Sequence, residues 1–168
     1  MPKDAPAGTT YQVQDVNKPW PEDWRGTFDL VHQRLVLVNA GNKQKEAVRS
    51  LADLVKPGGW IQLVEGDHPH PDAGWGPSMR DFNGVMQSIF YFMGADPEAT
   101  DKLNGWLEEL GFINVHSLQV RVKLAAQNPN AELARRGLFS MTTSAKSLPK
   151  FAKSTLLEPV GVSVSLAL

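Results

Sequence analysis

The alternation of apolar and polar residues along the chain predicts its strands. Residues 11–16, YQVQDV, alternate in the manner of a half-buried strand that ends at Asp15. A run rich in Val and Leu begins at Phe28 and predicts a strand to about His32 that is buried on both faces. The same reasoning predicts a strand over residues 60–65, and one strand or two short ones over residues 112–124.

Apolar residues at helical spacing predict four helices between and after these strands. The first covers residues 41–56 and ends at KPGG, a strong helix stop. The others cover residues 78–93, 95–112 and 131–143, the third with Pro97 near its start and Gly111 at its end. The order strand, helix, strand over residues 28–65 is a βαβ unit, which predicts an α/β fold with a parallel sheet and a right-handed crossover.

Length and composition describe an ordinary globular chain. The 168 residues predict one domain, with residues 1–10 as a flexible lead-in and residues 147–168 as a tail of undecided structure. The net charge of -1 argues against partners that are nucleic acids or anionic membranes. The absence of cysteine excludes disulfides, thiol nucleophiles and Cys-ligated metals. We expect a cytoplasmic protein, because no signal-peptide pattern and no apolar run of about 20 residues is present.

One ordered set of motifs points to a family. VQDV, KPWPEDW, FDLVHQR, VKPGGW and a strand ending at Glu65 follow one another along the chain. In order and spacing, residues 10–124 resemble the central and C-terminal part of class I S-adenosylmethionine-dependent methyltransferases, most of all fungal enzymes of secondary metabolism. The resemblance implies a Rossmann-like fold, a mostly parallel sheet flanked by helices, and a position for Asp15 near the cofactor adenine. A turn aspartate is the alternative for Asp15.

The sequence departs from the family in its first residues. Family members carry a strand with a Gly-rich loop, and then a strand ending in an acidic residue, before the strand that corresponds to residues 11–16. Residues 1–10 are too short to supply either. We therefore expect an incomplete methyltransferase fold with an exposed strand edge, a pairing hazard. The sheet could re-pair within the chain, with a second copy or with a separate chain, and we expect a homodimer. No cofactor is expected for the isolated chain, and S-adenosylmethionine is expected if a partner completes it.

Candidate catalytic residues follow the predicted strands, at the edge where ligands of open α/β sheets bind. His32 is a candidate acid or base with Gln33 and Arg34 beside it as substrate contacts, and the alternative is a histidine packed beneath the following helix. The loop EGDHPHPD supplies Glu65, Asp67 and His68 as further catalytic candidates. This loop also contains His70, and metal binding or plain solvation are its alternative interpretations. No metal is assigned.

Large apolar residues are the candidates for substrate binding. Tryptophans in loops often line apolar pockets, whereas Trp60 and Trp106 fit a core. The helix over residues 78–93 carries an apolar stripe that forms part of a substrate lid in the family, and a plain core stripe is the alternative. The candidates are Trp20, Trp24, Trp75, Phe82, Met86 and Phe90.

Three functions remain open from the sequence. The first is a cofactor-free cyclisation or isomerisation of a polyene or polyketide-like substrate, with His32 or His68 as the proton donor. The second is a methyltransferase whose missing half comes from a partner chain or a longer product. The third is a non-catalytic, dimerising relic. A Gly-x-Ser-x-Gly elbow and a P-loop are both absent from the sequence.

Overall fold

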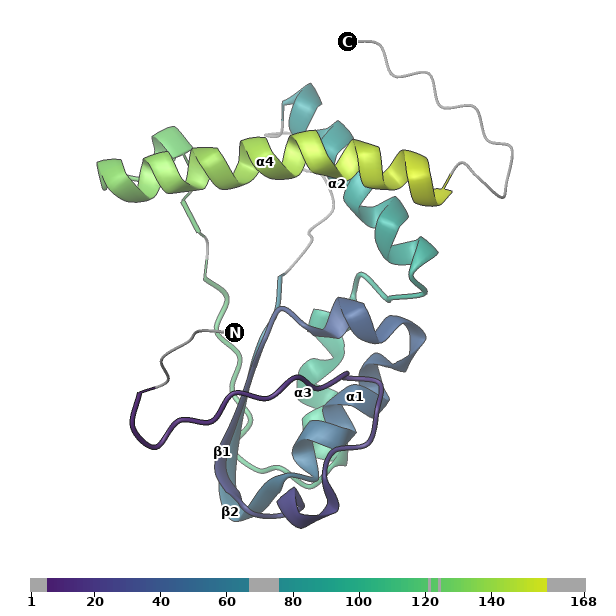
Figure 1. Ribbon diagram of the computed structural model, residues 1–168, viewed down its shortest axis with the longest axis vertical. Coiled ribbons are helices and arrows are strands. Elements are labelled where there is room, and N and C mark those ends of the chain that lie inside the picture. The colour runs from purple at the N-terminus through teal and green to yellow at the C-terminus, as the bar shows by residue number, and fades with distance from the viewer. Residues whose placement is uncertain (1–5, 67–75, 121, 124, 157–168) are drawn as a thin grey trace.

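A computed structural model of the chain describes residues 6–66, 76–120, 122–123 and 125–156. The described part is an α/β structure in which two strands stand beside two helices, while α2 and α4 form a separate layer beyond the ends of the strands (Figure 1). The elements in chain order are η1 (Glu22–Trp24), β1 (Phe28–Arg34), η2 (Leu37–Lys43), α1 (Gln44–Ala52), β2 (Val55–Val64), α2 (Pro77–Phe92), α3 (Ala99–Glu109), η3 (Ala125–Gln127) and α4 (Ala131–Leu156), where η denotes a 3-10 helix.

The predicted βαβ unit is confirmed, because β1 and β2 pair in parallel and α1 connects them along the chain. The KPGG segment, however, does not end the helix. Helix α1 ends at Ala52, and KPGG lies inside β2 at an irregularity of the strand pairing. An added Cβ at Gly59 would lie 2.9 Å from the carbonyl oxygen of Asp29, so the missing side chain lets the two backbones approach.

The core lies on one face of this strand pair. Leu37 and Val48 are essentially inaccessible, at 1% and 0% exposure. They pack with α3 through Leu107, and half-buried Ile61 and Leu63 of β2 contact this cluster. A second cluster of Val31, Leu51 and Leu54 continues it along α1. The helices therefore cover the face of the sheet that carries Val31, Ile61 and Leu63.

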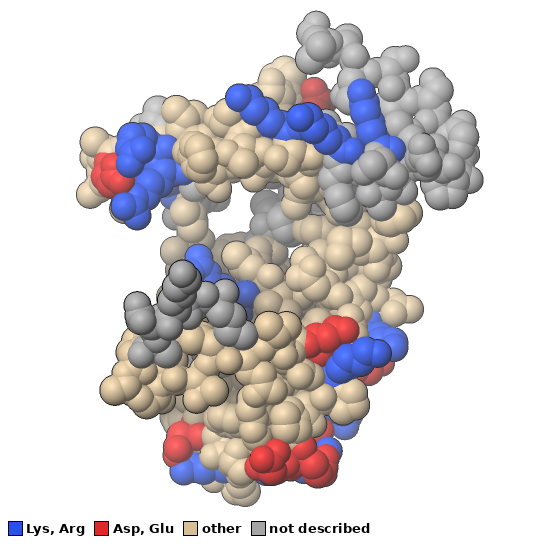
Figure 2. Space-filling model, in the orientation of Figure 1, with Lys and Arg blue, Asp and Glu red and all other residues tan. Residues whose placement is uncertain are grey.

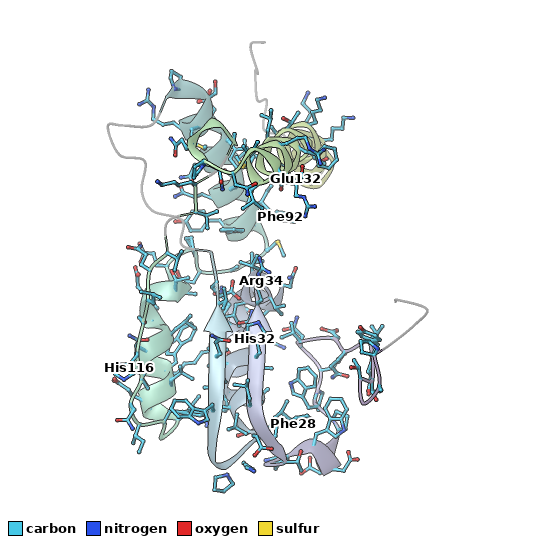
Figure 3. All side chains as sticks on the ribbon, turned by 90° about the vertical axis from the view of Figure 1, so that its left-hand side faces the viewer. Phe28, His32, Arg34, Phe92, His116 and Glu132 are labelled. Atoms are coloured by element: carbon cyan, nitrogen blue, oxygen red, sulfur yellow. The ribbon has the colours of Figure 1, made fainter. Side chains whose placement is uncertain are left out.

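The other face of the sheet is open, so the prediction of a strand buried on both faces is wrong for β1. Leu30 is 55% exposed and Trp60, expected in the core, is 67% exposed. Val64 lies on the same face and is also exposed. No helix of the described residues lies over this face, which is turned toward the viewer in Figure 3. We call the side chains of Leu30, Trp60 and Val64 the open face.

Two other predicted strands do not form within the described residues. Residues 11–16 and the described part of 112–124 have no strand pairing, and Val13 and Leu118 are 81% and 87% exposed. Both segments keep the alternating pattern of a strand, and Val16, Phe112 and Val115 pack on the core cluster, but neither segment pairs with a described strand. Backbone groups in an extended segment need a neighbouring strand, and local pattern cannot provide one.

The helical predictions are closer to the structure. Helix α2 matches its predicted range within one residue, and α3 ends just before Gly111, which has a φ of 89°. Helix α4 runs through Leu156, far beyond the predicted end at residue 143, and Lys and Arg side chains follow it in Figure 2. None of the described helices combines the length and apolar character needed to cross a bilayer. Residues 1–5 of the predicted lead-in and 157–168 of the tail lie outside the described residues.

We predict that Gly41→Ala destabilises the protein by about 1–3 kcal/mol in urea unfolding. Gly41 has φ 57° and ψ −129°, and an added Cβ would lie 2.6 Å from the carbonyl oxygen of Met93. The matched control is Gly105→Ala in α3, where the new methyl meets nothing within 4 Å. The control should stabilise the protein by roughly 0.5–1 kcal/mol. Equal effects of the two substitutions would contradict this account of Gly41.

A second pair of substitutions tests where the core lies. Leu37→Ala removes a side chain that is 1% exposed and should cost about 2–5 kcal/mol of unfolding free energy. Leu118→Ala changes a side chain that is 87% exposed and should stay within about 0.5 kcal/mol of the wild type. A large loss at Leu118 would show that the chain around Leu118 is packed in solution.

Candidate functional site

The carboxyl ends of β1 and β2 meet at one edge, where the register pairs Arg34 with Val64. Glu65 follows β2 directly and lies beside the turn from β1 into η2. Its Oε1 accepts hydrogen bonds from Gln33 Nε2 at 2.5 Å, from the Val36 N–H at 3.0 Å and from the Leu37 N–H at 2.9 Å. The structure thus places this predicted catalytic residue at the expected edge, but with one oxygen already occupied by three donors.

Gln33 and Arg34 point to opposite sides of the sheet. Gln33 is 5% exposed on the covered face, where its amide nitrogen donates to Glu65. Arg34 is exposed, and it lies at the end of β1 beyond His32 (Figure 3). Arg34 therefore lies on the same side of the sheet as His32, and Gln33 does not.

His32 lies on the open side of β1, two residues before the strand ends. Its Nδ1 is 2.9 Å from Oε1 of Gln62, the residue that pairs with it across the sheet. The side chain is exposed and is not packed beneath α1. Glu65 accepts a hydrogen bond from Gln33, which faces the covered side of β1. His32 and Glu65 therefore lie on different sides of the strand.

Asp15 closes a local turn. Its Oδ1 accepts the N–H of Asn17 at 2.9 Å, and its carbonyl oxygen accepts the N–H of Lys18. This is the pattern in which an aspartate side chain stabilises a turn. The alternative interpretation of Asp15 is the one that this geometry supports.

The two described loop tryptophans are anchors for the core. Trp20 and Trp24 stack with ring centroids 6.2 Å apart, and both pack on the cluster of Val31, Leu51 and Leu54. Trp20 also lines a cavity of about 270 Å³ between residues 16–25 and α1. That cavity has a charged lining and reaches residues that precede the two strands, so it does not open at the carboxyl edge. Sequence reasoning missed it because it forms between a loop and a helix.

The apolar stripe of α2 is largely internal. Phe90 is 7% exposed, Phe82 and Met86 are half-buried, and α2 packs against α4. Two aromatic side chains outside this stripe are instead exposed, namely Tyr91 at 67% and Phe92 at 49%. Periodicity could not find them, because it assigns each helix a single apolar side.

Charged side chains with clear pKa shifts lie in surface ion pairs. A hydrogen bond from Lys56 is the main cause that lowers the pKa of Asp29 on β1. Likewise, a hydrogen bond from Lys102 lowers the pKa of Asp96, at the start of the α3 region. These pairs keep the carboxylates charged, and neither belongs to the carboxyl edge.

Several predicted residues lie outside the described part, namely Asp67, His68, His70 and Trp75. Among the residues that are described, no group of three or more His, Asp or Glu side chains could hold a metal ion. Two groups at the candidate cofactor positions are engaged within the chain. The carboxylate of Asp15 is used by its own turn, and the N–H groups that follow β1 are used by Glu65.

Comparison with known proteins identifies relatives of one kind. The chain is 36% identical to the N-methyltransferase sirN of Leptosphaeria maculans over 79% of its own length and 48% of the relative. It is 31% identical to the N-methyltransferase gliN of Aspergillus fumigatus, over 89% of the chain and 57% of the relative. It is 33% identical to the methyltransferase psoC of the same fungus, over 92% of the chain and 56% of the relative.

The chain therefore spans about half the length of the curated relatives it matches. No protein-family model and no solved structure matches it. The order of its motifs, its parallel βαβ unit and this similarity over most of its length agree with one another. The chain is therefore similar over most of its length to fungal methyltransferases, which fits the S-adenosylmethionine-dependent methyltransferase family that its sequence resembles.

Proposed function

We propose that this chain is one part of a small-molecule methyltransferase of fungal secondary metabolism, active when a further polypeptide segment completes its sheet. The observation that carries the proposal is the open face, which consists of Leu30, Trp60 and Val64. Parallel sheets in α/β proteins are covered on both faces, and here the described helices cover only one.

The sequence relatives indicate what would cover this face. They are about twice as long as the matched part of the chain, so they contain further structure that these 168 residues do not align with. A complementary segment of that kind would bury the open face and could also supply the Gly-rich loop that residues 1–10 lack. A second copy of this chain would supply a cover but no such loop. We therefore favour a complementary segment over the expected homodimer.

A cofactor-free cyclisation or isomerisation is the second candidate. His32 and Trp60 lie on the same open side of the sheet. Covering that side would enclose an imidazole beside a large aromatic ring, the combination that a proton-donating apolar chamber needs. The carboxyl edge gives this candidate no support, because Glu65 is engaged with Gln33 and the backbone.

We predict that the chain alone does not bind S-adenosylmethionine at micromolar affinity in calorimetry. The part of the Leptosphaeria maculans relative outside the matched residues provides a complementary segment, and its addition should produce binding and methyl transfer. Micromolar binding by the chain alone would contradict the proposal. Turnover of a polyketide or terpenoid precursor by the chain alone, lost in His32→Ala, would favour the second candidate.

We predict that Leu30→Lys with Val64→Lys leaves the fold of the chain intact, within about 1 kcal/mol, because both side chains are exposed. The same double variant should capture the tagged complementary segment at least about tenfold less well than the wild type, because covering a lysine removes its charge from water. The matched control is Val31→Lys on the covered face, at 8% exposure, which should unfold the protein. If the wild type is a homodimer in solution and the double variant is a monomer, a second copy of the chain covers the open face, and the proposal is overturned.

A further inference from the structure

The turn that follows β1 has an unfavourable backbone conformation. Leu35 has a φ of 52°, in the left-handed region that a leucine rarely adopts. Such a conformation persists only where neighbouring interactions hold it, and it is concentrated at functional sites. Leu35 is also 53% exposed, so packing of its side chain does not hold the turn.

Three successive N–H groups of this turn donate hydrogen bonds to β2 and to Glu65, and these bonds hold the turn. The Leu35 N–H donates to the carbonyl oxygen of Val64 at 2.8 Å. The next two N–H groups, of Val36 and Leu37, donate to Oε1 of Glu65. These groups stand at the start of η2, where backbone N–H groups have no partner within the helix. A carboxylate is a strong acceptor for such groups.

The third donor ties the network to the core. Gln33 is 5% exposed and directs its Nε2 to the same oxygen of Glu65. Leu37, whose N–H is bound, is itself 1% exposed. The network therefore fixes the chain between a buried strand residue and a buried helix residue. Arg34 and Leu35 are left exposed between these two anchors, at the carboxyl edge of the sheet.

We propose that Glu65 is a positioning residue for the ligand site at this edge, rather than an acid or base. Its carboxylate holds residues 34–36 in the conformation that presents Arg34 and Leu35 outside the strand ends, where ligands of α/β sheets bind. An acid–base role for Oε1 would require that oxygen to leave its three donors. The existence of a ligand site at this edge rests on the proposed function, whereas the positioning role of Glu65 rests on its hydrogen bonds.

Amide hydrogen exchange on the full chain tests the positioning role without any ligand. Glu65→Ala should speed exchange of the Leu35, Val36 and Leu37 amides by at least about tenfold, the effect of losing bonds to a charged group. The matched control is Glu46→Ala on the exposed side of α1, which should leave these three amides within about twofold of the wild type.

A rescue variant separates positioning from a general loss of structure. Adding Leu35→Gly to Glu65→Ala should return the Leu35 amide to within about threefold of wild-type exchange, because glycine adopts a positive φ without the steric penalty of a side chain. Unchanged exchange in Glu65→Ala, or no recovery in the double variant, would overturn the proposal.

A second experiment measures ligand binding. It uses the chain together with its complementary segment, and S-adenosylmethionine is the probe. Glu65→Gln should weaken binding while the pH profile of methyl transfer keeps its shape. Loss of one limb of that profile would reveal an acid–base role and overturn the proposal. If the wild-type assembly neither binds the probe nor transfers a methyl group, the proposed function fails, and the exchange experiment still decides the role of Glu65.

Discussion

The structure depends on one constraint, which is that a parallel strand pair needs helices on its faces. The crossover from β1 to β2 runs through α1, which folds back onto the pair and buries Val48 and Leu51. Helix α3 adds to the same side through Leu107. The described chain satisfies this constraint on one side only. The exposed side chains of the other face therefore show where a covering layer is missing from the described residues.

The carboxyl edge follows from the same pairing. Because Arg34 pairs with Val64, the residue after β2 meets the turn after β1, and a glutamate there can accept the N–H groups that η2 leaves without partners. The strained turn at Leu35 is therefore stabilised from a different strand rather than from its own sequence. An acidic residue at a sheet edge can in this way resemble a catalytic group while it maintains the backbone.

The candidate site could be predicted in position but not in orientation. The rule that ligands bind outside the carboxyl ends of strands led to Glu65 and to the His32 region. Alternation along β1 would have placed His32 and Gln33 on opposite faces, but a Val- and Leu-rich run does not say which face is covered. Likewise, family resemblance placed Asp15 near a cofactor with a turn as the alternative, and its carboxylate accepts the Asn17 N–H two residues away.

The sequence by itself determined the elements whose signals are local. The parallel βαβ unit, α2 and α3 were all predicted from periodicity and end signals, because helix formation depends on residues a few positions apart. Tertiary structure decided which extended segments became strands. Residues 11–16 and 112–124 alternate as β1 does, yet only β1 and β2 pair among the described residues, because a strand exists only where another strand lies beside it. The open face was decided in the same way, since burial depends on what packs against a residue and not on the residue itself.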